Sequence, residues 1–130
     1  MLNMRLQKHW VDNINYSLDI NKYESCLGKT ININPEFKRD IIEVDTDNAI
    51  VKLSIKITNE NDAPFDVNVT ICGLFECKGW KDTNEGQDFI KFTSVQVLFP
   101  YLRQIVSTIT GLSNIQQYVL PIINVFDFFK

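Results

Sequence analysis

The chain has 130 residues and a mass of 15.1 kDa, which is enough for one hydrophobic core and too little for two, so we expect a single domain over residues 1–130. An apolar content of 45% and a charged content of 22% argue against a disordered chain. Thirteen basic and sixteen acidic residues give a net charge of −3 without a basic segment, so no nucleic-acid partner is expected.

The first two predicted strands are separated by a long connection. Residues 11–23 alternate irregularly between apolar and polar side chains, and residues 38–45 form a second strand that ends in a tight turn at residues 46–48. The connection, residues 24–37, carries four large apolar side chains among glycine, asparagine and proline. Loops of this length and composition are usually pinned to the fold or used for binding.

Residues 50–57 give the clearest periodic signal in the sequence. Val51, Leu53 and the apolar residues that follow alternate with lysine and serine, which indicates a strand with one buried and one solvated face. A further strand begins at Phe65, after several turn-forming residues, and keeps the same alternation to Glu76. We expect these two strands to pair as a hairpin and all four to form an antiparallel meander.

The composition changes over residues 93–126, which contain a single charged residue, Arg103. Pro100 suits the first turn of a helix and Gly111 suits its end. A stripe at helical spacing is expected to lie on the sheet, and it consists of Leu98, Leu102, Ile105, Ile109 and Leu112. The predicted fold class is therefore α+β, a four-stranded antiparallel sheet covered on one face by a long C-terminal helix.

The opposite face of this helix is small, uncharged and partly apolar, and has no evident reason to face water. The chain after Gly111 is short and interrupted by Pro121, so we favour burial against a second copy of the chain over burial by the chain itself. The predicted oligomer interface consists of Phe99, Arg103, Gln104, Val106, Ser107 and Thr108. The segment 112–129 is richer still in large apolar residues, which predicts apolar surface for partners.

The sequence lacks the motifs of common enzymes. It has no glycine-rich phosphate loop, no metal-spaced cluster of histidine and cysteine, and no nucleophile elbow. A thiol hydrolase that pairs Cys72 or Cys77 with His9 is compatible with the spacing, but nothing in the sequence orients such a pair. A carrier of small apolar ligands is another alternative. We expect no catalytic residue, no metal and no cofactor.

The sequence also predicts a cytoplasmic protein that does not insert into a membrane. No apolar run approaches the roughly 18 residues of a membrane span, and the first ten residues lack the apolar core of a signal peptide. The three cysteines, Cys26, Cys72 and Cys77, are an odd number, which suits a reducing compartment.

Residues 97–103 have the sequence Val-Leu-Phe-Pro-Tyr-Leu-Arg, and residues 120–125 have the sequence Leu-Pro-Ile-Ile-Asn-Val. The two segments, with a helix and a glycine between them, resemble the LFPYAR and P-(V/I)-N-F region of SecB-type protein-export chaperones. Asn-Pro-Glu at residues 34–36 and Gly-Leu-Phe at residues 73–75 are similar to further features of the family in the same order. The resemblance spans nearly the whole chain.

The resemblance implies a chaperone that binds non-native polypeptides without ATP and keeps them unfolded for export or delivery. It implies a homo-oligomer, a dimer of dimers with helices at the tetramer interface. The implied client-binding residues are Leu27, Ile31, Ile33, Phe37, Ile115, Tyr118, Leu120 and Ile122. An apolar groove of this kind accepts unrelated segments because burial contributes about 25 cal/mol per Å² whatever the sequence.

In the family, an acidic face of the sheet docks the translocase motor SecA. Asp19 and Glu24 match two of its positions, whereas a third acidic position is Asn68 here and its apolar neighbour is Asp66. Shorter SecB-like proteins serve as chaperones of the antitoxins in toxin–antitoxin systems. The resemblance therefore leaves two versions of the function open, one with export clients and SecA and one with a dedicated antitoxin client.

Overall fold

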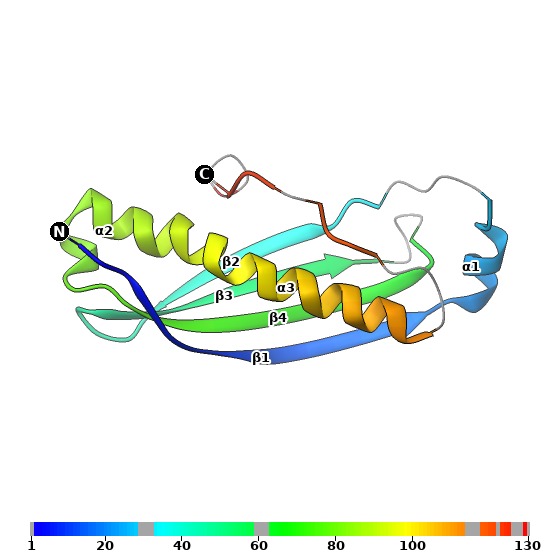
Figure 1. Ribbon diagram of the computed structural model, residues 1–130, viewed down its shortest axis with the longest axis horizontal. Coiled ribbons are helices and arrows are strands. Elements are labelled where there is room, and N and C mark those ends of the chain that lie inside the picture. The colour runs from blue at the N-terminus through cyan, green and yellow to red at the C-terminus, as the bar shows by residue number, and fades with distance from the viewer. Residues whose placement is uncertain are drawn as a thin grey trace.

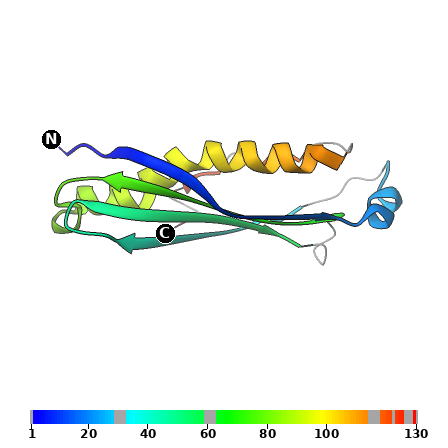
Figure 2. The same ribbon diagram turned by 90° about the horizontal axis from the view of Figure 1, so that it is seen from below.

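The chain folds into two layers, an antiparallel sheet and a long helix that crosses one face of it (Figures 1 and 2). The computed structural model describes residues 2–28, 33–58, 63–113, 118–121, 123–125 and 129. The strands are β1 (Arg5–Leu18), β2 (Glu36–Glu43), β3 (Asn48–Ile57) and β4 (Phe65–Glu76). The helical elements are α1 (Ile20–Ser25), η2 (Trp80–Asp82), α2 (Asn84–Asp88), the π-helical η3 (Phe89–Thr93), α3 (Ser94–Thr110) and η4 (Gly111–Ser113). The predicted α+β fold is confirmed.

The order of the strands differs from the predicted meander at its first strand. β2, β3 and β4 pair in succession as predicted, but β1 lies beside β4, so that the order is β1-β4-β3-β2. The connection from β1 to β2 therefore passes from one edge of the sheet to the other. β1 and β4 have 14 and 12 residues and β2 has eight, so the observed pairing satisfies more backbone hydrogen-bonding groups of β1 than β2 could.

β1 also begins and ends earlier than the predicted strand 11–23. It starts at Arg5, in the part of the chain that the sequence analysis left without structure. After Leu18 the Asp19 carboxylate accepts a hydrogen bond from the backbone N–H of Lys22 at 3.0 Å. This N-cap starts helix α1, so the residues after Asp19 are helical and the strand prediction was wrong there.

Two irregularities in the pairing of β1 with β4 explain its irregular sequence. They lie between Leu6 and Lys8 and between Val11 and Asn13. Because side chains alternate along a strand, each extra residue shifts the alternation by one. Leu6, Val11 and Ile14 consequently pair with buried residues of β4 and lie on the helix side of the sheet.

The core lies between the sheet and α3. The alternation predicted for β3 and β4 is confirmed, since their buried residues include Val51, Leu53, Ile55, Ile57, Phe65, Val67, Val69, Ile71 and Phe75. Gly73 takes an inward position of β4 that has no room for a side chain. A Cβ atom there would lie 2.9 Å from Cδ2 of Leu98 and 2.8 Å from the Phe75 ring.

The helical part of the chain begins well before the predicted start at Pro100. The Thr83 hydroxyl caps it by accepting a hydrogen bond from the backbone N–H of Gly86 at 3.0 Å, and α2, η3 and α3 follow without a break. Pro100 lies inside α3, where packing of the buried face outweighs the local cost of a proline. Gly111 caps the end of α3, as predicted.

None of the helices among the described residues is long and apolar enough to cross a membrane.

The buried face of α3 is rotated relative to the predicted stripe. Leu98, Leu102 and Ile109 are buried as predicted, and Ile105 is half-buried. Leu112, however, is 74% exposed, so its predicted place on the sheet is wrong. Val95, Phe99 and Val106, which lie outside the predicted stripe, are buried as well, so the buried face extends to one side of that stripe.

The C-terminal segment covers the other side of α3. Its described residues run back along the helix on the side of β2 (Figure 1). Arg103 donates from Nε to the carbonyl of Leu120 at 2.9 Å. Three residues of the segment join the core, Leu120, Val125 and Phe129. Phe99 and Val106 are therefore buried within one copy of the chain, where the sequence predicted burial against a second copy.

The position of Gly73 under α3 can be tested by substitution. We expect Gly73→Ala to lower the free energy of unfolding by about 1–3 kcal/mol, because the new methyl group overpacks the core. In a Leu98→Ala background, which vacates part of that space, the same change should cost less. Urea denaturation of the four proteins at one protein concentration measures both effects. An equal cost in the two backgrounds would show that Leu98 does not set the space at Gly73.

Candidate functional site

The predicted client-binding residues differ in their exposure. Leu27 is 63% exposed just after α1. Ile33 and Phe37 are half-buried and pack against the core, and Leu120 is fully buried. Ile31, Ile115 and Ile122 lie outside the described residues. Ile33 and Phe37 of the connection therefore pack against the same core as Leu120 of the C-terminal segment. Leu27 stays at the surface.

Tyr118 belongs to a row of aromatic rings near the end of the sheet. The Phe65 ring lies edge-on to Tyr118, with 6.0 Å between the ring centroids, and edge-on to Tyr16, with 6.3 Å. The backbone N–H of Tyr118 donates to Oγ1 of Thr110 at 3.0 Å, which ties the segment to the last residue of α3. Burial raises the pKa of the Tyr118 phenol, so this side chain is a neutral, largely apolar surface at physiological pH.

Arg39 on β2 contacts the far end of the C-terminal segment. It donates from Nη1 to the carbonyl of Lys91 and, at 3.4 Å, to the carbonyl of Phe129. Its guanidinium lies 5.2 Å from the centroid of the Phe129 ring and 5.5 Å from that of Phe92. Burial lowers the pKa of Arg39, although an arginine stays charged in such a site.

Sequence reasoning missed Arg39, although a signal was present. Arg39 stands between Phe37 and Ile41 on the face of β2 that points to the core. A charged residue at an inward position of a strand requires a partner, and the carbonyl oxygens and aromatic rings of the C-terminal segment and the helix supply it. The alternation of β2 therefore marks Arg39 as unusual without identifying its partners.

A second surface combines β1 with the solvent side of α3. Val11 and Ile14 lie on the helix side of β1 and remain exposed, and Tyr101 of α3 is exposed beside them. The rings of His9 and Tyr101 stack with centroids 4.3 Å apart, which joins the strand to the helix. Among the described residues, β1 pairs with β4 alone, so its other edge is an edge of the sheet.

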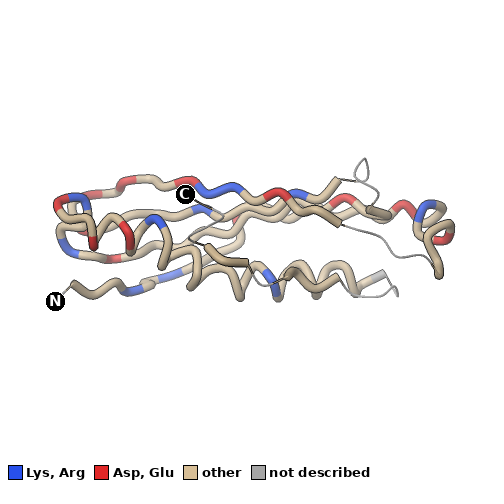
Figure 3. Tube along the Cα trace, turned by 90° about the horizontal axis from the view of Figure 1, so that it is seen from above, with Lys and Arg blue, Asp and Glu red and all other residues tan. Residues whose placement is uncertain are grey.

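The remaining predicted interface residues divide between this surface and the side of the C-terminal segment. Gln104 and Thr108 are exposed, whereas the half-buried Arg103 and Ser107 line a shallow cavity with Val119 of that segment. Arg103 is the single charged residue between Ser94 and Thr110, and the tube of α3 in Figure 3 is otherwise uncharged. An uncharged helix surface next to an exposed sheet edge is the kind of surface that subunit interfaces use.

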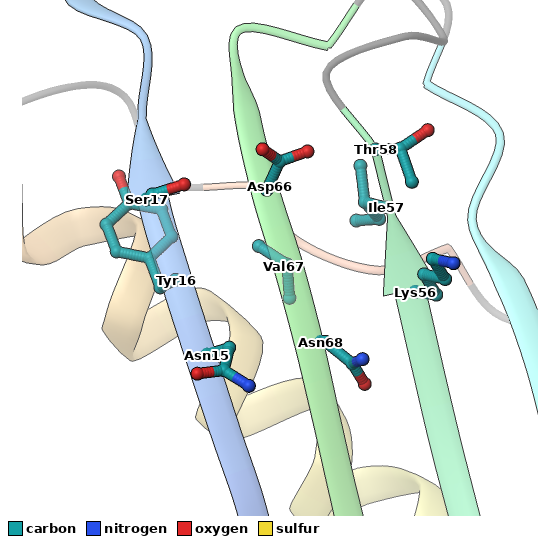
Figure 4. Close-up of a pocket in the computed structure, with 9 residues that line it drawn as sticks. All are labelled: Asn15, Tyr16, Ser17, Lys56, Ile57, Thr58, Asp66, Val67 and Asn68. Carbon is teal, nitrogen blue, oxygen red and sulfur yellow. The ribbon is translucent and has the colours of Figure 1, made fainter.

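The far face of the sheet carries a shallow cavity of about 350 Å³ (Figure 4), near the end of the sheet where α1 lies. Its residues come from β1, β3 with Thr58, and β4, and are Asn15, Tyr16, Ser17, Lys56, Ile57, Thr58, Asp66, Val67 and Asn68. The cavity includes Asp66 and Asn68, the two positions at which the sequence differs from the acidic SecA-docking face that the family resemblance implies. The carboxylate of Asp19 caps α1, and Glu24 is exposed on that helix.

The geometry does not bring the imidazole of His9 to the thiol of Cys72. His9 pairs with Gly73 and Cys72 pairs with the next residue of β1, so their side chains lie on opposite faces of the sheet. Burial raises the pKa of the Cys72 and Cys77 thiols, which makes both weak nucleophiles near pH 7. All three cysteines are free. Among the described residues, no three acidic, histidine or cysteine side chains gather closely enough to hold a metal ion.

Relatives are found at the level of sequence. A sequence profile of the SecB family, described as preprotein translocase subunit SecB, matches residues 3–130. A curated relative, the uncharacterized protein MJ0357 of Methanocaldococcus jannaschii, is 27% identical over 124 residues, which are 94% of this chain and 79% of that protein.

Solved structures share the fold. The SecB-like chaperone Rv1957 of Mycobacterium tuberculosis, in complex with a ChAD peptide from the Rv1956 HigA1 antitoxin, matches with a TM-score of 0.69 and 15% identity over 92% of this chain and 90% of its own. A protein of unknown function from Streptococcus agalactiae matches with a TM-score of 0.54 and 11% identity over 94% of this chain and 99% of its own. At these identities the likeness shows the fold alone. Because the family profile spans nearly the whole sequence, the chain belongs to the SecB family.

Proposed function

We propose that this chain is an ATP-independent chaperone that binds non-native polypeptides on apolar surface and keeps them unfolded for export or delivery. The observation that carries the proposal is membership of the SecB family over residues 3–130. The exposed Leu27 and the half-buried Ile33, Phe37 and Tyr118 support it, because they offer apolar contact without a fixed pattern of polar partners. The proposed action is binding, with no bond made or broken and no cofactor.

The proposal has two versions, which differ in the client. The general version is an export client, in keeping with the description of the family as a preprotein translocase subunit. The second version is a dedicated antitoxin client, favoured by the structural likeness to a SecB-like chaperone that was solved with an antitoxin peptide. Docking on SecA is the weaker part of the first version, since Asn68 and Asp66 depart from the acidic face and the Asp19 carboxylate caps α1.

We also propose that the chain acts as one SecB-like unit in a homo-oligomer, a dimer of dimers. The exposed edge of β1, with Val11 and Ile14, and the uncharged solvent side of α3 form the surface for a second copy. Gln104 and Thr108 are the exposed helix residues of this proposed interface, whereas Arg103 and Ser107 lie toward the C-terminal segment. The three free cysteines suit the reducing cytoplasm, where we place the protein.

The chaperone proposal predicts that the wild-type chain suppresses aggregation of a reduced, unfolded model protein without nucleotide. Leu27→Asp should weaken binding of that protein about tenfold, because a carboxylate loses hydration in an apolar contact. The matched control is Val44→Asp, since Val44 is 50% exposed and Leu27 is 63% exposed, but they lie at opposite ends of the sheet. Light scattering and fluorescence titration give the two readouts. Failure of the wild-type chain to suppress aggregation would overturn the proposal, and equal effects of the two variants would overturn the place of Leu27.

The oligomer proposal predicts a native mass of two or four times 15.1 kDa. Ile14→Lys should shift the population to the monomer, because it sets a charge into the proposed interface. Ile42→Lys is the matched control, since both side chains are 44% exposed and Ile42 lies on the other face of the sheet, in the other edge strand. Native mass spectrometry distinguishes the states. A wild-type monomer would contradict the proposal.

The hydrolase alternative predicts that the thiol of Cys72 or Cys77 reacts much faster than the other two. The structure predicts instead that Cys26 reacts first. Cys26 is the most accessible of the three cysteines, whereas burial raises the pKa of Cys72 and Cys77. We expect a maleimide reagent at pH 7.0, a pH chosen for thiol selectivity, to modify Cys26 first and the other two only after unfolding. Peptide mapping by mass spectrometry follows the three sites. Rapid labelling of Cys72 in the folded protein would reopen the enzyme alternative.

A further inference from the structure

A shallow cavity of about 280 Å³ lies between α3 and the described part of the C-terminal segment. It is lined by Pro100, Arg103, Gln104, Ser107 and Val119. In the helix, Pro100 is followed by the other three at spacings that place all four on one stripe, and none of the four is buried. Val119 borders the cavity from the segment and is 52% exposed.

Arg103 is the charged side chain of this cavity, and one of its edges is already held. Its Nε donates to the Leu120 carbonyl at 2.9 Å, and the side chain is half-buried. A guanidinium carries its N–H donors in a planar fork, so the contact at Nε fixes the plane. The donors of the two Nη atoms form the end-on edge of the fork. This edge is the part of Arg103 that can serve a further acceptor.

Among the described residues, Arg103 has no acidic partner. The ion pairs that these residues form all join lysines to carboxylates, and no other charged residue lies between Ser94 and Thr110. The Ser107 hydroxyl and the Gln104 amide in the same cavity can also donate. A half-buried cation beside further donors is a site for an acceptor that carries negative charge.

A carboxylate on a carbon chain fits this arrangement. Its two oxygens accept parallel hydrogen bonds from the end-on edge of a guanidinium and keep lone pairs for a hydroxyl or an amide. Pro100 and Val119 give the cavity apolar walls, which favour a ligand with carbon groups next to its charge over a free inorganic anion. An aspartate or glutamate within an apolar segment of a non-native polypeptide has this form.

Resting on the proposed function, we propose that Arg103 and Ser107 form a subsite for an acidic side chain of the client. Val119 stands next to Tyr118 in the chain, so the cavity adjoins the apolar surface assigned to the client. The apolar contacts accept unrelated segments, and the subsite adds a preference for segments that carry aspartate or glutamate. Arg103 and Ser107 then act outside the oligomer interface in which the sequence analysis placed them.

The test is a double-mutant cycle between the chain and a peptide. Two fluorescent, unstructured peptides of the same apolar sequence differ only in a central glutamate or glutamine, and fluorescence anisotropy gives their affinities without nucleotide. We expect wild type to prefer the glutamate peptide about fivefold. Arg103→Met should bind the two peptides equally, and Ser107→Ala should keep part of the preference. Any effect of the lost Nε contact on the C-terminal segment weakens both peptides alike, so the cycle removes it.

Lys56→Met is the control for net charge. Lys56 is exposed on the far face of the sheet, so its loss should leave the preference unchanged. A salt titration of wild type needs no variant. Raising NaCl from about 50 mM to about 500 mM should lower the preference for the glutamate peptide and leave binding of the glutamine peptide intact, because salt screens a solvent-accessible ion pair.

Equal affinities of wild type for the two peptides, or the full preference in Arg103→Met, would overturn the subsite, while binding of the glutamine peptide leaves the proposed function standing. Native mass spectrometry supplies a further check. A shift of Arg103→Met toward the monomer would assign Arg103 to the contact between copies and would also overturn the subsite. If wild type binds neither peptide and no unfolded protein, the proposed function fails and the subsite falls with it.

Discussion

The contact between the inward face of β3 and β4 and the buried side of α3 is the constraint on which the rest of the structure depends. Strict alternation gives these two strands a continuous apolar face, and a glycine at residue 73 leaves room for Leu98. Because the helix is fixed there, its two flanks are fixed as well. One flank lies beside β1 and the other lies beneath the C-terminal segment, so the surfaces that we propose for assembly and for client contact lie on the two sides of one helix.

The parts of the fold that rest on local pattern could be predicted from the sequence. The β3 and β4 hairpin, the turn before Asn48 and the end of α3 at Gly111 follow from alternation and turn chemistry within a few residues. The place of β1 beside β4 could not be predicted this way, because pairing depends on residues far apart in the chain. The position of Pro100 inside α3 is a tertiary effect that overrides a local preference.

The sequence indicated which residues belong to the candidate site, but it gave less information on how they are arranged. The family resemblance identified apolar residues of the connection and the C-terminal segment, while nothing local indicates whether the chain or a second copy covers Phe99 and Val106. The structure attributes that cover to the chain. Arg39 is the clearest case, because its partners lie 52 and 90 residues away along the sequence. Such a contact exists only once the sheet and helix are assembled.

The crossing of the long connection from one sheet edge to the other has a mechanical consequence. It places β1 and β2 at opposite borders of the sheet, so the border that we propose for a second copy is remote from the border beside Ile33 and Phe37, which we propose for the client. On these two proposals, loading and unloading on one side would leave the quaternary contacts on the other undisturbed. Such an assembly could exchange its cargo without coming apart.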